Sequence, residues 1–185
     1  MMYSDTDIQI AIDKGDLKVE PLFDGSIRPG GLRLHLGETI LKPRPGIVAD
    51  VKAGILPEYD TIIIPEEGYL IEPSGFVLSA TYEKVSIGNN LGFLIEGRST
   101  LARLGLTIVQ TAMIVYPGHT NRAVTLELAN HGPNAIKLYP KMKIARAALF
   151  EMKSPSSKSY DDEGKYNKQE DVGPPIFDNE IVSFK

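Results

Sequence analysis

A glycine-bounded segment near the middle of the sequence combines two arginines with hydroxyl side chains. Residues 97–105 read Gly-Arg-Ser-Thr-Leu-Ala-Arg-Leu-Gly. We expect Ser99 to cap a short helix over residues 100–104. The start of a helix presents unpaired backbone N–H groups, which suit a phosphate, and Arg98 and Arg103 would add forked, permanently charged donors on either side. The alternative is a structural turn whose arginines pair with surface acids.

A second segment places a carboxylate on the polar face of a strand. Side chains of the expected strand Ala123–Ala129 alternate between two faces, so Thr125 and Glu127 share one face and Leu126 points to the other. A carboxylate in this position is usually only solvated. If it faces a pocket, however, it can accept and return a proton during a reaction.

Composition removes several kinds of chemistry. The chain has no cysteine, which excludes disulfides, thiolate nucleophiles and zinc held by sulfur. No two histidines lie at metal-binding spacing, so we predict no metal held by the protein alone. We expect His119 and His131 to be solvated in turns and His35 to make a local strand contact. Arg122 and Arg146 could reach a subunit interface, although ordinary surface ion pairs are commoner.

Charge and hydropathy narrow the range of partners. The formal net charge of −4 would repel a polynucleotide, so we expect no nucleic-acid polymer, whereas a small anion could bind where a few basic side chains converge. The longest apolar runs, residues 62–64 and 145–150, are too short to cross a bilayer. The first residues are polar and acidic rather than a basic, apolar leader. We therefore expect a single-domain, cytoplasmic protein with no membrane partner.

The elements that must position these side chains are short. Ser4 and Asp7 form the Ser-x-x-acid start of a helix and Gly15 supplies a stop, so we predict one amphipathic helix over residues 5–14. Short apolar runs separated by Gly, Pro, Asn and Asp follow, which is typical of an antiparallel barrel or sandwich. The expected strands are Leu32–Leu36, Thr61–Ile64, Tyr69–Ile71, Phe76–Thr81, Leu91–Ile95, Leu106–Gln110, Ala123–Ala129, Ala135–Leu138 and Lys143–Glu151.

The C-terminal part of the sequence changes character. Residues 153–175 are polar and rich in Ser, Lys, Asp and Gly, which predicts a mobile arm. Two interpretations remain open: a frayed terminus, or a lid that orders over a ligand and excludes water. We divide the chain into a barrel over residues 1–152 and an arm over residues 153–185 that belongs to the same domain.

Several segments, taken in order, resemble the dCTP deaminase family of the dCTP deaminase/dUTPase superfamily. They are Glu96 to Leu106, Thr111-Ala112, Pro117-Gly118, Thr125 to Leu128 and, in the tail, Gly164 to Gln169. The segment from Pro29 to Gly37 stands where the family has Pro-x-Ser-x-Asp-Leu-Arg-Leu-Gly. The likeness covers nearly the whole chain, and its central signature is specific.

The resemblance implies a mainly β fold, a distorted antiparallel β-barrel or jelly-roll of the trimeric dUTPase-like type, with an N-terminal helix, a short central helix and sites between subunits. It also implies hydrolytic deamination of dCTP to dUTP and ammonia. Glu127 would act as general base and acid, Ser99 would hold the water that attacks C4 of cytosine, and Arg103 would help to keep the carboxylate ionised. Because the Cys and His ligands of the zinc deaminases are missing, no zinc is expected.

The remaining residues implied by the resemblance bind the nucleotide. The backbone at Thr111-Ala112 would read the edge of the base, and the arm would contact the phosphates and the sugar. The full substrate-binding set is Arg98, Thr100, Leu101, Ala102, Thr111, Ala112, Tyr116, Thr125, Leu126, Tyr160, Lys165 and Gln169. Mg²⁺ would arrive bound to the triphosphate of the substrate.

Three departures from the family pattern leave other functions open. Tyr116 stands where the family has an acid that grips the 3′-hydroxyl of the sugar, residues 117–122 form a loop one residue longer, and Gly30-Gly31 replaces a patch containing Ser and an acid. Ala102 agrees with the monofunctional members. The alternatives are a bifunctional deaminase–diphosphatase or a dUTPase, both releasing pyrophosphate, and an inactive nucleotide-binding regulator.

Overall fold

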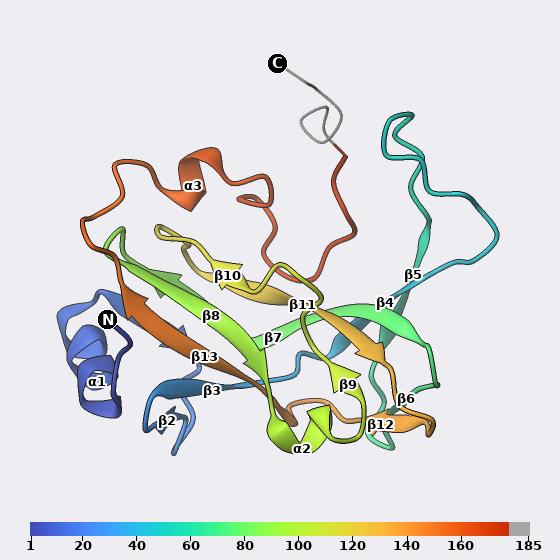
Figure 1. Cartoon of the computed structure of the whole chain (residues 1–185), viewed down its shortest axis with the longest axis horizontal. Helices are drawn as coiled ribbons and strands as arrows, with labels where there is room; N and C mark the ends of the chain where they lie inside the picture. Colours follow the sequence, from blue (N-terminus) through green and yellow to red (C-terminus); the bar gives the residue numbers. More distant parts are fainter. Residues whose placement is uncertain (178–185) are drawn as a thin grey trace.

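Antiparallel strands are the main regular secondary structure of the computed structural model, which describes residues 1–177 (Figure 1). The helices are α1 (Asp5–Lys14), α2 (Ser99–Ala102) and α3 (Tyr160–Glu163). The strands are β1 (Leu17–Glu20), β2 (Ile27–Arg28), β3 (Gly31–His35), β4 (Thr39–Pro43), β5 (Tyr59–Ile63), β6 (Tyr69–Ile71), β7 (Phe76–Ile87), β8 (Leu91–Gly97), β9 (Leu106–Thr107), β10 (Ile114–Val115), β11 (Arg122–Asn130), β12 (Ile136–Leu138) and β13 (Lys143–Glu151). Among the described residues, no helix is long and apolar enough to cross a bilayer.

The strands form two larger sheets and one small one. The six-stranded sheet has the order β5-β4-β7-β11-β9, with β1 also paired to β7. The five-stranded sheet has the order β10-β8-β13-β3-β2, and β12 pairs with β6 separately. These ladders are antiparallel. The expected mainly β, antiparallel fold is therefore confirmed.

One hydrophobic core joins the two larger sheets. Leu126 and Leu128 of β11 are fully buried in it. The same cluster contains Leu34, Phe93 and Leu149 of the five-stranded sheet. Burying one such side chain stabilises the fold by roughly 1.5–3 kcal/mol. This burial fixes which face of β11 points inward, and therefore which side chains point outward.

Helix α1 forms as its sequence predicts. The Ser4 side chain accepts a hydrogen bond from the backbone of Asp7, and the Asp7 carboxylate accepts one from the backbone of Ser4. Gly15 ends the helix in the left-handed conformation, with φ of 79°. Ile8 and Ala11 form the buried face of the helix.

Several boundaries differ from the expectations because pairing partners decide them. β7 continues to Ile87 because β1 and β11 both pair with its second half. The strand expected over Leu106–Gln110 ends at Thr107, and the N–H of Gln110 binds the Glu127 side chain rather than a strand carbonyl. The patterns did not predict β1, β2, β4 and β10, which are short, nor α3 in the arm.

The short central helix begins earlier than expected. α2 starts at Ser99 itself, and its N-cap is Arg98, whose extended backbone (φ −93°, ψ 133°) makes no side-chain capping bond. The prediction that Ser99 caps the helix is therefore wrong. A cap needs a non-helical backbone, whereas Ser99 already lies inside the first turn.

His35 and Glu83 form a buried pair between β3 and β7. Nδ1 of His35 lies 2.5 Å from Oε1 of Glu83, and the backbone N–H of His35 donates to Oε2 at 2.9 Å. Phe23 packs edge-on against the imidazole, with ring centroids 4.7 Å apart. The expectation of a local contact for His35 is wrong, since its partner is 48 residues away in the chain.

Replacing Glu83 with alanine should destabilise the fold. The substitution leaves the buried imidazole and backbone N–H of His35 without a hydrogen-bond partner. We therefore expect the free energy of unfolding to fall by about 2–4 kcal/mol. Urea denaturation measures this value. As a control, Glu66→Ala in an exposed turn should cost less than about 0.5 kcal/mol. Equal losses in the two variants would contradict a structural role for the buried pair.

Candidate functional site

A pocket of about 540 Å³ lies between β11 and the C-terminal arm. Both parts of the chain contribute side chains to its wall, together with the segment that follows β9 and the loop before β11. The lining residues are Tyr59, Phe76, Leu78, Gln110, Thr111, Ala112, Ile114, Val115, Tyr116, His119, Arg122, Ala123, Val124, Thr125, Glu127, Tyr160, Tyr166, Gln169, Gly173, Pro174 and Pro175. The volume falls within the roughly 300–1,000 Å³ typical of small-ligand sites.

Glu127 lies on the pocket wall, on the face of β11 that the alternation predicts for it. Thr125 shares this face, whereas the side chain of Leu126 lies in the core on the opposite face. Oε2 of Glu127 accepts a hydrogen bond from the backbone N–H of Gln110 at 2.8 Å. This bond orients the carboxylate and leaves its other oxygen available to a ligand or a water. Leu126 could meet a ligand only through its backbone.

The segment after β9 brings backbone groups to the pocket. Thr111 and Ala112 are exposed, lie outside any strand and line the cavity. Their peptide groups are therefore not all committed to a sheet ladder and are able to bind a planar ligand edge. Thr111 and Ala112 thus line the same pocket as Glu127, and the expected strand ends before it reaches them.

The arm packs on the barrel instead of extending away from it (Figure 1). Tyr160 and Asp161 of α3 donate backbone hydrogen bonds to the carbonyls of Pro117 and Gly118, at 2.8 and 3.2 Å. Gly118 has φ of 75°, and a Cβ at this position would lie 2.4 Å from Cβ of Ser159. Only glycine allows so close an approach. Of the expected arm 153–185, residues 178–185 lie outside the described part of the chain.

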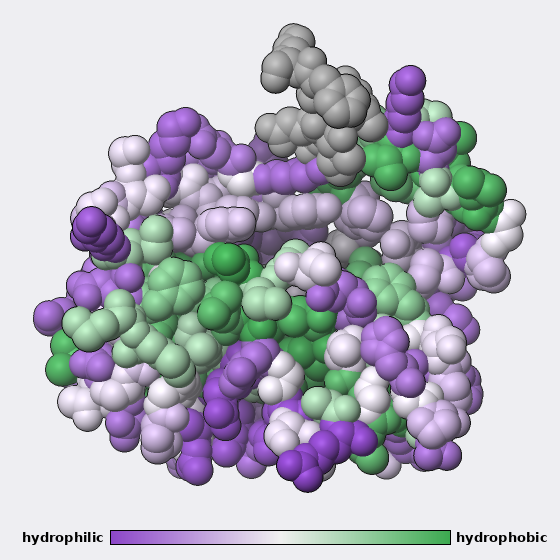
Figure 2. Space-filling model, viewed as in Figure 1, coloured by the Kyte–Doolittle hydropathy of each residue, from purple (hydrophilic) through white to green (hydrophobic). Residues whose placement is uncertain are grey.

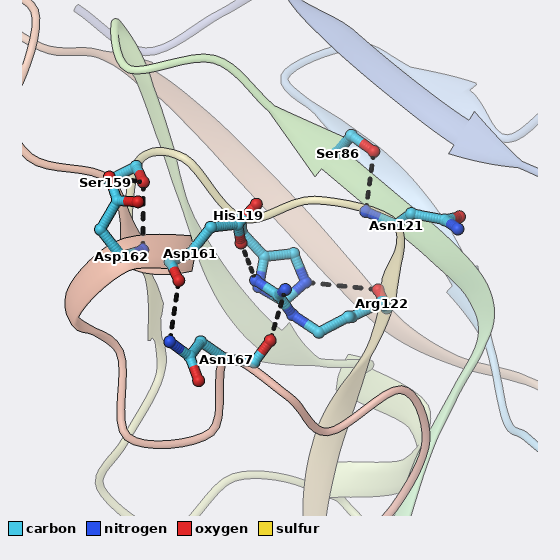
Figure 3. A network of polar contacts seen from close by, with 8 residues as sticks. All are labelled: Ser86, His119, Asn121, Arg122, Ser159, Asp161, Asp162 and Asn167. Carbon is cyan, nitrogen blue, oxygen red and sulfur yellow. Dashed lines mark hydrogen bonds and ion pairs between the residues drawn. The ribbon is translucent and has the colours of Figure 1, made fainter.

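Arg122 is the anchor of the docked arm (Figure 3). Its side chain is buried, forms an ion pair with Asp161, and donates from Nη1 to the carbonyl of Asn167 at 2.9 Å. Asn167 in turn donates to the carbonyl of Asp161 at 2.8 Å. Burial alone would raise the pKa of Asp161, but hydrogen bonds from Thr120 and Arg122 lower it overall. Arg122 is thus an internal anchor, and the expectation of an exposed surface pair is wrong.

Aromatic rings form the wall between the barrel and the arm. The rings of Tyr116 and Tyr160 are nearly parallel, 10° apart, with centroids separated by 6.4 Å. Tyr160 also lies near His119, with ring centroids 5.8 Å apart, and near the guanidinium of Arg122, 5.6 Å from the ring centroid. At the position where the family pattern has an acid, Tyr116 therefore supplies a ring that packs on the arm.

His119 is buried rather than solvated, which corrects the expectation from its place in a turn. Its Nε2 donates to the carbonyl of Arg122 at 3.3 Å. Burial lowers the pKa of His119, and this outweighs the opposite effect of that hydrogen bond. His131, by contrast, is exposed, as expected.

The other expected arm residues are placed differently from one another. Gln169 lines the pocket and donates from Nε2 to Oγ1 of Thr125 at 2.9 Å. Tyr166 also lines the pocket, and its hydroxyl accepts a hydrogen bond from the backbone of Ile176 at 3.2 Å. Lys165 is exposed on the arm and is not part of the lining.

The predicted phosphate-binding segment is not part of this pocket. Within the described chain, none of Arg98, Ser99, Thr100, Leu101, Ala102 and Arg103 lines it. α2 lies at the far end of the molecule from α3 (Figure 1). Among the residues that line the pocket, Arg122 is the only arginine or lysine, and it is paired with Asp161. A single chain therefore brings together the Glu127 carboxylate and the aromatic rings of the pocket wall. It does not bring Arg98 and Arg103, which were expected beside them, into the same pocket.

No metal-ligand group is formed within residues 1–177. No three His, Asp or Glu side chains there converge as a set that could hold an ion.

The fold resembles that of a solved nucleotide enzyme. A solved 2′-deoxycytidine 5′-triphosphate deaminase from Agrobacterium tumefaciens superposes with a TM-score of 0.63 at 15% identity, covering 80% of this chain and 47% of that one. The family model described as dCTP deaminase-like matches residues 2–152. The chain belongs to this dCTP deaminase-like family.

Two relatives match over nearly their whole length. A protein of Halobacterium salinarum named "dCTP deaminase, dUMP-forming" is 34% identical over 181 residues, which cover 94% of this chain and 92% of that protein. A protein of Halorubrum lacusprofundi named "dCTP deaminase" is 37% identical over 181 residues, covering 94% of this chain and 89% of that protein.

Acid should release the arm from the barrel. Docking holds His119 with a pKa below its ordinary value of about 6.5, so the undocked form binds more protons and is favoured as the pH falls below that value. Hydrogen exchange of residues 156–170, corrected for intrinsic rates, should report loss of protection between neutral pH and about pH 5.5. His119→Phe removes the titrating ring but keeps an aromatic contact with Tyr160. Identical pH dependence in this variant would contradict the assignment to His119.

Proposed function

We propose that this chain deaminates dCTP, with Glu127 as the general base. The observation that carries the proposal is the Glu127 carboxylate, oriented by the N–H of Gln110 on the wall of a pocket of nucleotide size. The relatives named dCTP deaminase support the choice of substrate. The stacked rings of Tyr116 and Tyr160 offer apolar surface to a base or a deoxyribose.

The proposed reaction needs one carboxylate and one water. Glu127 takes a proton from the water as it attacks C4 of cytosine, and delivers a proton to N3. Glu127 then takes the proton of the new C4 hydroxyl and passes it to the amino group, so that collapse of the tetrahedral intermediate expels ammonia and leaves a uracil ring. Because the chain has no cysteine, the proposal assigns activation of the water to Glu127 and to hydrogen bonds. Mg²⁺ would enter as part of the substrate, bound to its phosphates, where it would offset their negative charge.

A second copy of the chain would complete the site. The arginines and hydroxyls of residues 98–103 lie outside the pocket of their own chain. Figure 2 shows hydrophobic surface over β8, β10 and β13, in the middle of the face that also carries α2. Exposed Leu94, Met113 and Ile114 contribute to the apolar surface of these segments. We propose a homotrimer in which this face is covered and Ser99 and Arg103 of one copy meet Glu127 of the next.

Glu127→Gln should abolish turnover while binding is retained. The amide keeps the shape of the side chain but cannot accept the proton, so we expect the rate of ammonia release to fall by about 10²–10⁴-fold. Calorimetric titration with dCTP measures binding in the same variant. As a control, Glu66→Gln in an exposed turn should leave both values unchanged.

Mixing variants tests the shared site. Glu127→Gln and Arg103→Ala proteins, each inactive alone, should regain part of the activity when their subunits are exchanged, because some interfaces then pair two intact halves. Full activity of Glu127→Gln alone would refute the role of the carboxylate. Two inactive variants that never complement would refute the arrangement between copies.

Release of dUMP is the second candidate outcome. The name of the Halobacterium salinarum protein is "dCTP deaminase, dUMP-forming", which favours further cleavage of the triphosphate over release of dUTP, whereas Ala102 agrees with the monofunctional pattern. Incubation with dCTP and Mg²⁺, followed by separate assays of ammonia and pyrophosphate, separates the two. We expect ammonia in either case, and pyrophosphate in equal amount if dUMP is the product. Tight dCTP binding without any ammonia would instead support a nucleotide-binding regulator.

A further inference from the structure

Two arginines face each other across neighbouring strands of the five-stranded sheet. The register places Arg33 of β3 directly opposite Arg146 of β13, and Arg146 directly opposite Glu96 of β8. Residues that are directly opposite in a sheet point to the same face. Arg33 and Arg146 are both accessible to solvent. The outer face of the sheet therefore carries two adjacent guanidinium groups with one carboxylate beside them.

Two further arginines extend this row at its ends. Arg28 of β2 is paired with Gly31, which precedes Arg33 by two positions on the same strand and so shares its face. Arg98 follows Glu96 by two positions and keeps an extended backbone, so it also shares the face of Glu96 and Arg146. We call Arg28, Arg33, Arg98 and Arg146 the arginine row.

The arginine row carries more positive charge than its surroundings balance. Arg146 lies 3.8 Å from a carboxylate oxygen of Glu96. Within residues 1–177, the other three arginines form no ion pair with an acid. Desolvation lowers the pKa of Arg33, and the charges of Arg28, Arg98 and Arg146 lower it further. This concentration of like charge stands out in a chain whose formal net charge is −4.

The backbone is shaped to admit one of these side chains. A Cβ at Gly31 would lie 3.0 Å from both Cγ and Cδ of Arg146, and 2.8 Å from the carbonyl oxygen of Ala147. The stem of Arg146 therefore passes across Gly31. In the family pattern Pro-x-Ser-x-Asp-Leu-Arg-Leu-Gly, the positions of Gly31 and Arg33 carry Ser and Asp. At these two positions this chain therefore has a glycine that leaves room for the Arg146 stem and an arginine in place of an acid.

We propose that the arginine row binds a chain of phosphates, namely the triphosphate tail of the nucleotide. A guanidinium group can donate two parallel hydrogen bonds to the oxygens of one phosphate. Neighbouring strands lie about 4.8 Å apart, so the guanidinium groups of Arg33 and Arg146 are within reach of one oligophosphate. Arg98 opens residues 98–103, where the sequence predicts phosphate binding. The inference rests on the proposed function for the identity of the ligand. Arg28, Arg33 and Arg146 then enlarge the phosphate site beyond residues 98–103.

Binding measurements test the row directly. The variants are Arg33→Gln, Arg146→Gln and the double variant, titrated calorimetrically with dCTP, dCMP and inorganic triphosphate. We expect each single substitution to weaken binding of dCTP and of inorganic triphosphate by about tenfold, and binding of dCMP by less, because one phosphate contacts fewer guanidinium groups. Arg44→Gln is the matched control, since Arg44 is exposed and paired with Glu58 and Asp60.

Thermal melting without ligand separates lost binding from lost folding. Removing one of several like charges relieves repulsion, so the Arg33→Gln protein should melt at the temperature of the wild type or above it. If a glutamine variant unfolds, Arg33→Lys keeps the charge, loses the fork, and should still weaken binding of inorganic triphosphate.

The outcomes for the row and for the proposed function are distinguishable. Weaker binding of inorganic triphosphate by both single variants supports phosphate binding by the arginine row, even if no ammonia is ever released from dCTP. Conversely, unchanged binding of dCTP and inorganic triphosphate in the double variant overturns the row, even if deamination proceeds.

Discussion

The buried guanidinium of Arg122 is the interaction on which the pocket depends. It lies at the start of β11, pairs with Asp161 of α3 and binds the carbonyl of Asn167, so it ties the strand that carries Glu127 to the arm that covers it. An arginine removed from water must have such partners, because an unpaired buried charge costs several kcal/mol. The arm therefore does more than cover a surface: its oxygens pair with a guanidinium that is buried where the arm meets the barrel.

Charge is distributed unevenly between the two parts of the proposed site. The pocket offers rings, backbone groups and one oriented carboxylate, while its single arginine is already paired. Unpaired positive charge instead lies on the outer face of the five-stranded sheet, around Arg33 and Arg98. The charge of a nucleotide is distributed in the complementary way: its base is a neutral ring, and its negative charge lies on the phosphates at the other end. A homotrimer that sets the arginine-bearing face of one copy against the pocket of the next would match both ends.

The departures from the family pattern become interpretable in three dimensions. Tyr116 replaces an acid, and its ring stacks on Tyr160 of the arm. Gly31 replaces a serine, and the stem of Arg146 passes over it. His35 occupies the arginine position of the same pattern and pairs with buried Glu83. Each of these residues has a partner that is distant in the sequence.

The sequence by itself determined the features that depend on near neighbours. The capping box and glycine stop define α1, and alternation along β11 separates Glu127 from Leu126, because helix ends and strand faces follow from a few adjacent residues. It did not determine the environments of His119, Arg122 and His35, whose partners lie on other elements. Nor did it indicate that Arg33 and Arg146 are neighbours, since strand register brings them together across more than 100 residues of chain. Burial and charge balance are properties of contacts that exist only once the sheets have formed, so the tertiary structure alone decided them.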